Sequence, residues 1–376
     1  MRKIIDKLTI FGCLVIFLLL TLIASKYIEI FLKLKPNMTK INNSALEIHF
    51  VDVGEGDATL VKFSSGKTML IDAGEKSQSK YLTSYIDKVF FRDYKNKKFD
   101  YVVLTHSDSD HIGGMYNILE KYKVDNFIRP KILINGLENY LIDGQVKYDN
   151  NDDYVSTISK LYELKNSNKT KVTFAESDNI IDMGNNAYVH ILSPLKPYYS
   201  TTNDYSTVMT INDNGFSAML TGDASSEVEN MVVNSYDDDV LDVDLLKLGH
   251  HGSNTSTSSL FLQATSPRYI VVSASDDNSY NHPSVDVLDS IEEYNQDNSN
   301  IATLLQTGYL GNIVVYNNGN NNDGYITINN INDYLFLSWW VVVLVLIVVI
   351  GVSLFMGDLI GLLNRNKATN IRTFNS

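Results

Sequence analysis

Short apolar runs rich in β-branched and aromatic residues alternate with amphipathic stretches along the middle of the chain. The short runs are typical of strands, and apolar positions spaced by three and four residues are typical of helices. The predicted strands are 47–51, 58–63, 67–71, 101–104, 188–192, 207–211, 217–220, 243–248, 269–272 and 313–316. The predicted helices are 80–90, 112–121, 155–163, 226–233, 258–264 and 285–294.

Strands in hairpin arrangement open this region, and strands alternate with helices later in it. The mixture predicts one α+β domain over residues 46–316, in which helices cover layered sheets rather than a purely parallel sheet. No internal repeat is visible in the sequence. Residues 317–333 are rich in Asn and predict a spacer, and residues 26–45 predict a stem before the domain.

The N-terminal stretch 8–25 is apolar, carries no charge and follows three basic residues. It just reaches the length that crosses a bilayer, and it predicts a membrane anchor over residues 1–25. A secretory signal peptide is the alternative, although the stretch is long for one and no small-residue cleavage site is obvious after it.

The C-terminal stretch 334–356 is a stronger candidate for a transmembrane helix. Trp339 and Trp340 lie near one edge of it, as in an interfacial belt, and basic residues follow in the tail 357–376. Basic residues outside both spans predict a protein of the cell membrane with both termini in the cytoplasm and the domain outside it. Lysines in the stem weaken this signal.

The net charge and the cysteine content argue against certain kinds of binding and of structural site. The net charge is −13, which does not favour tight nonspecific binding of nucleic acid, and no dedicated nucleic-acid-binding motif is present. The single cysteine, Cys13, excludes internal disulfides and Cys-rich zinc sites.

The string THSDSDHIGG at 105–114 directly follows an apolar strand and carries the strongest chemical signal. Its spacing lets His106, Asp108, Asp110 and His111 converge on one point, and close carboxylates need a compensating cation. Imidazole with carboxylate suits zinc or manganese. The alternative is a solvated loop in which the aspartates cap the next helix.

This string resembles the HxHxDH signature of the metallo-β-lactamase fold, with Asp108 in place of the second His. Further segments resemble the extracytoplasmic hydrolase-like domain of ComEC competence proteins and its stand-alone relatives. These segments are HFVDVGEGDATLV at 49–61, MLIDAG at 69–74, LTGDAS at 220–225, DLLKLGHHGSNTS at 244–256 and YNHPS at 280–284. The resemblance implies a four-layer αββα sandwich, here flanked by one transmembrane helix at each end.

The resemblance also implies a centre of two divalent ions. His106 and Asp108 would serve one ion, Asp110 and His111 the other, and Asp223 would bridge them. For Asp223 alone, an N-cap of the following helix is the alternative. The usual intermediate His has no clear match, which allows an enzyme with only one tightly bound ion.

Three later histidines compete for the remaining roles. His250 and His251 are adjacent, and neighbouring side chains after a strand do not point the same way. The order of elements in relatives slightly favours His282 as the last ligand and the pair, with Asp110, as catalytic, but both assignments stay open. Asn203 and Ser253 are candidate substrate-binding residues.

The remaining polar residues in the motifs receive supporting roles. His190 lies within a strand pattern and is interpreted as structural. Asp52, Glu55, Asp57 and Asp72 follow the early strands and are interpreted as turn residues or as partners of the ligands.

The implied reaction is hydrolysis by a metal-activated hydroxide, and phosphodiesters suit a two-metal site best. The predicted substrates are nucleic-acid strands, an envelope polymer such as a teichoic acid, or a lipid headgroup. A lactone or amide hydrolase on the same site is one alternative. A non-catalytic binding module, in contact with DNA-uptake or envelope-assembly proteins, is another.

Overall fold

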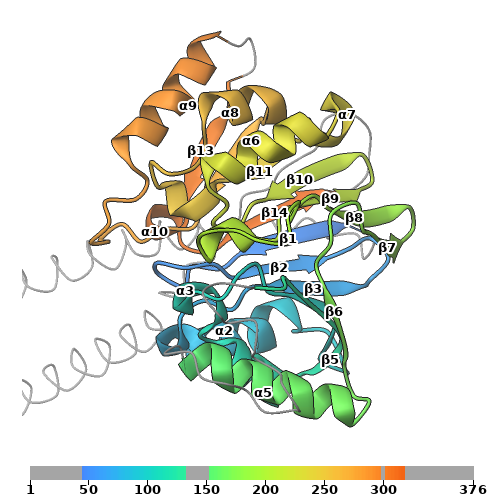
Figure 1. The fold of residues 1–376 in the computed structure, drawn as a ribbon. Helices are drawn as coiled ribbons and strands as arrows, with labels where there is room; N and C mark the ends of the chain where they lie inside the picture. Colours follow the sequence, from blue (N-terminus) through green and yellow to red (C-terminus); the bar gives the residue numbers. More distant parts are fainter. Residues whose placement is uncertain (1–44, 133–151, 298–300, 318–376) are drawn as a thin grey trace, which may run out of the picture. The chain divides into compact units, whose positions relative to one another are not determined.

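Two seven-stranded sheets pack face to face between layers of helices (Figure 1). The computed structural model describes residues 45–132, 152–297 and 301–317, all within one compact unit, Thr39–Ile331. The predicted anchor, stem, spacer, transmembrane helix and tail lie outside the described residues. Within the described residues, no helix has the length and apolarity needed to cross a membrane.

The two sheets share one plan. The order of the first sheet is β14 (Ile313–Asn317), β1 (Leu46–Phe50), β2 (Thr59–Lys62), β3 (Thr68–Ile71), β4 (Lys98–Val103), β5 (Lys123–Arg129) and β6 (Lys171–Phe174). The order of the second is β13 (Thr303–Gln306), β12 (Tyr269–Val272), β11 (Leu245–Lys247), β10 (Phe216–Leu220), β9 (Met209–Asp213), β8 (Ala187–Ile191) and β7 (Ile180–Gly184).

Strand direction changes from antiparallel to parallel at the same step in each sheet. In the first sheet β1, β2 and β3 pair antiparallel, and β3 to β6 pair parallel. In the second sheet β7 to β10 pair antiparallel, and β10 to β13 pair parallel. The fold therefore contains a structural duplication that the sequence does not display.

Helices cover the outer face of each sheet, as the predicted α+β class requires. The first layer contains α2 (Ser79–Tyr85), the π-helical turn η2 (Ile86–Phe90), α3 (Ser109–Ile112), α4 (Met115–Lys121) and α5 (Asp152–Asn166). The second contains α6 (Ser226–Ser235), α7 (Asp238–Leu241), α8 (Ser259–Thr265) and α9 (Val285–Asp297). Short turns η1 (Lys76–Gln78), η4 (Asn203–Tyr205), η5 (Gly249–Gly252) and α10 (Thr307–Leu310) connect strands and helices.

Apolar side chains fill the space between the two sheets. The polar groups of the motifs lie beyond this apolar layer, in the loops where the strands end. The central cluster joins residues of both sheets, including Ile48, Val61, Ile211 and Val271. Burial of each such side chain contributes about 1.5–3 kcal/mol. This apolar layer fixes the two sheets against each other, so that the loops at their common edge keep a constant relative position.

The first and last described strands pair with each other. Leu46 of β1 lies opposite Asn317 of β14 in an antiparallel ladder. The first and last described strands therefore begin and end side by side at one end of the first sheet.

A buried carboxyl group joins α6 to the start of α8. Glu229 is 1% exposed and accepts hydrogen bonds from the backbone N–H groups of Thr257 and Ser258 and from the Ser258 hydroxyl. Burial raises the pKa of Glu229 to about 7, because these hydrogen bonds only partly offset the loss of solvent.

We therefore expect Glu229 to make folding stability pH-dependent. The folded pKa of about 7 lies above the ordinary value of 4.5, so its contribution is full below pH 4.5 and is lost as the pH rises to 7. The loss is roughly 3 kcal/mol. Urea unfolding of Glu229→Gln across this range should show a flatter dependence than the wild type. The exposed Glu227→Gln is the control, and identical slopes for Glu229→Gln and the wild type would contradict the expectation.

Candidate metal centre

The candidate site lies at the carboxyl ends of central strands of both sheets, on one side of the domain. β4 leads into Thr105 and the short helix α3, and β10 leads through a turn to Asp223. β11 is followed by the turn η5, which carries His250 and His251. Because β3 and β4 are parallel, and β10 and β11 are parallel, their carboxyl ends meet at this edge.

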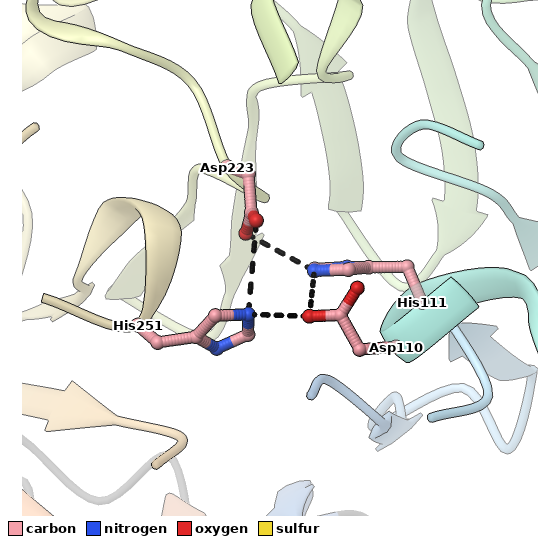
Figure 2. Close-up of side chains that lie close together, drawn as sticks. All are labelled: Asp110, His111, Asp223 and His251. Atoms are coloured by element: carbon pink, nitrogen blue, oxygen red, sulfur yellow. Dashed lines mark hydrogen bonds and ion pairs between the residues drawn. The ribbon is translucent and has the colours of Figure 1, made fainter. Parts of the chain in front are cut away.

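Four side chains form the centre of the site, and Figure 2 shows them pointing toward one another. Asp110, His111, Asp223 and His251 each offer one ligand atom, and these atoms lie within 4.8 Å of one another. His111 Nε2 lies 3.1 Å from Asp223 Oδ1, and His251 Nε2 lies 3.0 Å from Asp110 Oδ2. Both sheets therefore contribute to one cluster, which brings together Asp110, His111 and Asp223 from the predicted ligand set.

His106 and Asp108 adjoin this group on the other side of Asp223. His106 Nε2 lies 3.8 Å from Asp223 Oδ2 and 3.8 Å from Asp108 Oδ2. Asp108 begins α3 without using its side chain as a cap, and Ser225, not Asp223, is the N-cap residue of α6. The capping interpretations of these two aspartates therefore find no support in the structure.

Buried polar atoms without hydrogen bonds test whether this donor set fits a cation. Among the described residues, His106 Nε2 is buried and has no hydrogen-bond partner, and the buried His111 Nε2 and Asp223 Oδ1 meet only each other, as an ion pair at 3.1 Å. Each is a lone-pair donor in the same cluster. Leaving such atoms unpaired costs about 1–3 kcal/mol each, whereas divalent ions such as zinc or manganese bind these donors. The donor set fits a metal centre.

The ring orientation of two histidines is set by acceptors behind them. His111 Nδ1 donates to Asp72 Oδ2 over 2.8 Å, and His251 Nδ1 donates to the Ser273 carbonyl over 2.8 Å. The backbone N–H and hydroxyl of Thr105 also donate to Asp72. With Nδ1 engaged in this way, each Nε2 faces the cluster, an arrangement typical of metal-binding histidines.

A buried ion pair between Lys247 and Asp57 lies on the protein-interior side of the site. Lys247, on β11 and 2% exposed, donates to Asp57 Oδ2 over 2.6 Å. Asp57 follows Gly56, whose φ of +127° and closeness to the Asp110 carbonyl leave no room for a Cβ. The pair joins the β1–β2 loop of the first sheet to the second sheet directly beneath the histidines.

Opposite charges stabilise one another inside the cluster. Burial would raise the pKa of Asp223, but the imidazoles of His111 and His251 outweigh it and hold the pKa well below its usual range. Burial would lower the pKa of His251, but the Asp223 and Asp110 carboxylates raise it to about 9. Protons on the histidines therefore balance the carboxylates when no metal is bound.

The adjacent histidines occupy different environments, as predicted. Both have left-handed backbone, with φ of 48° at His250 and 54° at His251. The side chain of His251 is 2% exposed and belongs to the central group, whereas that of His250 is 29% exposed. The amide nitrogen of Asn203 lies 3.3 Å from His250 Nε2. Asn203 and His250 thus form the open side of the site.

The other two candidates lie next to the group rather than in it. His282 Nδ1 lies 2.9 Å from Glu55 Oε1, and the His282 ring centre is 6.2 Å from that of His251. The geometry places His251 rather than His282 in the ligand group, and a ligand role for His282 stays a prediction. Ser253 is buried, and its Oγ accepts hydrogen bonds from Thr255, so it shapes the loop. Its substrate-binding role also stays a prediction.

Lys247 was not recognised from the sequence, whereas Asp72 had been interpreted as a turn residue or as a partner of the ligands, and it contacts His111. The single charge inside the apolar run LLKL at 245–248 was a usable signal for Lys247, because a buried lysine needs a partner. His190, interpreted as structural, lies away from the cluster, with its ring centre 5.6 Å from that of Tyr236.

Comparison with known families agrees with this geometry. Residues 51–275 match the sequence profile of the metallo-beta-lactamase superfamily. The chain belongs to this superfamily. The match includes the cluster described above, and together they support a metal-dependent hydrolase; they also confirm the predicted fold family.

Relatives with known names extend the comparison. The chain is 28% identical to ComE operon protein 3 of Bacillus subtilis over 66% of this chain and 31% of that protein. It is 25% identical to competence protein ComA of Neisseria gonorrhoeae over 67% of this chain and 30% of that protein. The chain thus spans about a third of each relative, and the predicted resemblance to ComEC-type domains is confirmed.

Among solved structures, the metallo-beta-lactamase fold protein YhfI from Bacillus subtilis matches 71% of this chain and 98% of that chain. Its sequence identity is 16% and its TM-score is 0.41.

Metal binding should release protons, because a ligating imidazole must be neutral. With the pKa of His251 at about 9 before metal binds, the affinity for zinc or manganese should rise as the pH increases toward 9. Calorimetry at pH 7 in buffers of different ionisation enthalpy should show release of about one proton or more per ion.

Asp223→Asn should weaken binding by more than the roughly 10- to 100-fold that loss of a supporting partner costs. His190→Gln, a histidine replacement outside the cluster, should bind metal like the wild type. Binding without proton release would contradict the proposed ligand role of His251.

Proposed function

We propose that this chain is a membrane-anchored, extracytoplasmic, metal-dependent phosphodiesterase with nuclease-like chemistry. The observation that carries the proposal is the cluster of His106, His111, Asp223 and their neighbours. Its buried imidazole nitrogens and carboxylate oxygens converge within a few ångströms, and the partly exposed His250 lies beside them, 3.8 Å from Asp223.

The residues divide into two ligand sets that share Asp223. We assign Asp110, His111 and His251 to one ion and His106 with Asp108 to the other. Divalent ions held by these residues would supply the chemistry of lowering the pKa of bound water and polarising a phosphoryl oxygen. Asp110 Oδ2, whose carboxyl has a pKa below the usual range, is the acceptor placed to hold and orient a water proton.

His250 and Asn203 form the proposed contact with the substrate. The Nε2 atom of His250 faces Asp223 at 3.8 Å, and its Nδ1 lies 2.9 Å from the Thr255 hydroxyl. Burial lowers the pKa of His250 and so favours its neutral ring, whose Nε2 accepts a hydrogen bond from the Asn203 amide nitrogen. We assign this ring to take up the proton that the attacking water loses and to pass that proton to the leaving oxygen, with Asn203 holding the ring.

A phosphodiester is the favoured substrate class for electrostatic reasons. Two neighbouring divalent ions would offset the carboxylates of the cluster and receive the two charged oxygens of a phosphoryl group. The competence names of the relatives favour a nucleic-acid strand, and an envelope polymer is the alternative source of the same linkage. The membrane location and a link to uptake or envelope proteins belong to the same proposal.

Hydrolysis of bis-p-nitrophenyl phosphate with manganese or zinc tests the proposal. Asp110→Ala should lose activity and bind metal more weakly. His250→Gln should retain the bound metal but lower kcat about 100-fold or more, as expected for loss of a proton donor. His190→Gln is the matched control. If the metal-loaded wild type fails to cleave this diester and single-stranded DNA, the phosphodiesterase assignment is wrong.

A further inference from the structure

A lysine-rich hollow lies at the end of the domain opposite the metal centre. This cavity of about 980 Å³ lies between the ends of α4 and α5 and the first residues of β5 and β6. Six lysines line it and define what we call the lysine face: Lys121, Lys123, Lys160, Lys165, Lys169 and Lys171. Three acidic residues also line it, so the face is positively charged in a chain whose net charge is −13.

Three of these six lysines have no ion pair with an acidic residue in the part of the chain that the structure describes. Lys160 pairs with Glu120 and Glu163, Lys123 pairs with Asp125, and Lys121 pairs with Asp87, so the acids around the hollow are already neutralised. For Lys165, Lys169 and Lys171, no ion pair is found within the described parts of the chain, and all three are exposed. They carry free positive charge toward solvent.

The chain leaves the domain at this same end. Leu46 lies opposite Asn317, and its neighbour Glu47 lies opposite Lys62 at the end of β2. Lys62 lies opposite Thr68 at the start of β3, which runs parallel to β4 and β5. The strand starts that carry the lysines and the two chain exits therefore share one edge of the first sheet.

The opposite edge is acidic. Asp52 and Glu55 lie in the β1–β2 loop beside the metal centre, and Asp276 is close enough to Asp52 to help raise the pKa of that carboxyl, which burial chiefly raises. The six residues of β4 separate the two edges by roughly 20 Å. The three exposed lysines without an ion pair in the described residues thus lie at the chain exits, and Asp52, Glu55 and Asp276 lie beside the site.

We infer that the lysine face docks on a membrane surface rich in anionic phospholipid. This inference rests on the proposed membrane anchoring, which brings the chain exits and hence the lysine face to the bilayer. Attraction of the lysines and repulsion of the acidic edge then orient the domain with its metal centre directed away from the lipid. The substrate is reached from the aqueous side, which disfavours a lipid headgroup as substrate.

Lysine labelling in nanodiscs tests the inference with the full chain. The wild type is reconstituted in phosphatidylcholine alone or mixed with phosphatidylglycerol, and acetylation of each lysine is followed by mass spectrometry. Each lysine near an anionic surface favours docking by about fivefold. Lys165, Lys169 and Lys171 should therefore become at least about fivefold less reactive in the anionic discs, and salt should remove this protection.

Two charge-matched variants make the comparison specific. Lys165→Gln, Lys169→Gln and Lys171→Gln together should abolish the protection of the remaining Lys121 and Lys123. The control variant replaces Lys80, Lys131 and Lys196, three exposed lysines toward the site edge, with Gln, and it should keep the protection of the lysine face.

The possible outcomes distinguish failure of the docking on lipid from failure of the proposed membrane anchoring. A chain that does not enter the nanodiscs overturns the membrane anchoring and the docking with it. A chain that enters them but shows equal labelling in both lipids overturns the docking alone. Protection by a single-stranded DNA oligonucleotide in neutral discs, without protection by phosphatidylglycerol, overturns it in favour of a nucleic-acid surface.

Discussion

Burial of carboxylates and imidazoles at the shared edge of two sheets is the constraint on which this structure depends. Asp57, Asp72 and Asp223 are almost fully inaccessible, and isolated charges in such positions are strongly unfavourable. Each has a specific partner: Lys247 for Asp57, His111 for Asp72, and His111 with His251 for Asp223. Removal of a single partner leaves an uncompensated buried charge, which costs about 3–5 kcal/mol. The negative charge of these buried carboxylates must therefore be balanced inside the site, either by a bound cation or by protons on the histidines.

The position of this unit follows from the duplicated sheet plan. In each sheet the change from antiparallel to parallel pairing falls beside the strands that carry the ligands, β3 and β4 in one sheet and β10 and β11 in the other. Parallel neighbours send their following loops to the same edge, so Asp72 meets His111, and Asp223 meets His251. Strand β14 returns to the first sheet and pairs with β1, so that Leu46 and Asn317 lie opposite each other at the far end of the strands. One topology thus separates the candidate metal centre from the first and last described residues.

Much of this arrangement is readable from local sequence, and the exceptions have physical causes. Continuous apolar runs, such as β3 and the end of β4, were predicted as strands because they are buried on both faces. β6, β7 and β13 were missed: β6 and β7 are partly exposed, and β13 has only four residues at the margin of its sheet. β5 was missed because Asp125 and Asn126 interrupt its apolar pattern. Within the site, the string from His106 to His111 was recognised because its ligands are local in sequence.

The choice between His251 and His282 was not readable, because it depends on two left-handed residues in one turn. A strand-like continuation after β11 would alternate His250 and His251 across the sheet, but it would not fix which of them faces Asp223. The observed φ values of 48° and 54° turn the chain sharply, and the Ser273 carbonyl then holds the His251 ring toward Asp110. Glu55 holds His282 at the rim instead. Both acceptors lie far from their histidines in sequence or in another loop, so only the assembled fold decides which imidazole enters the cluster.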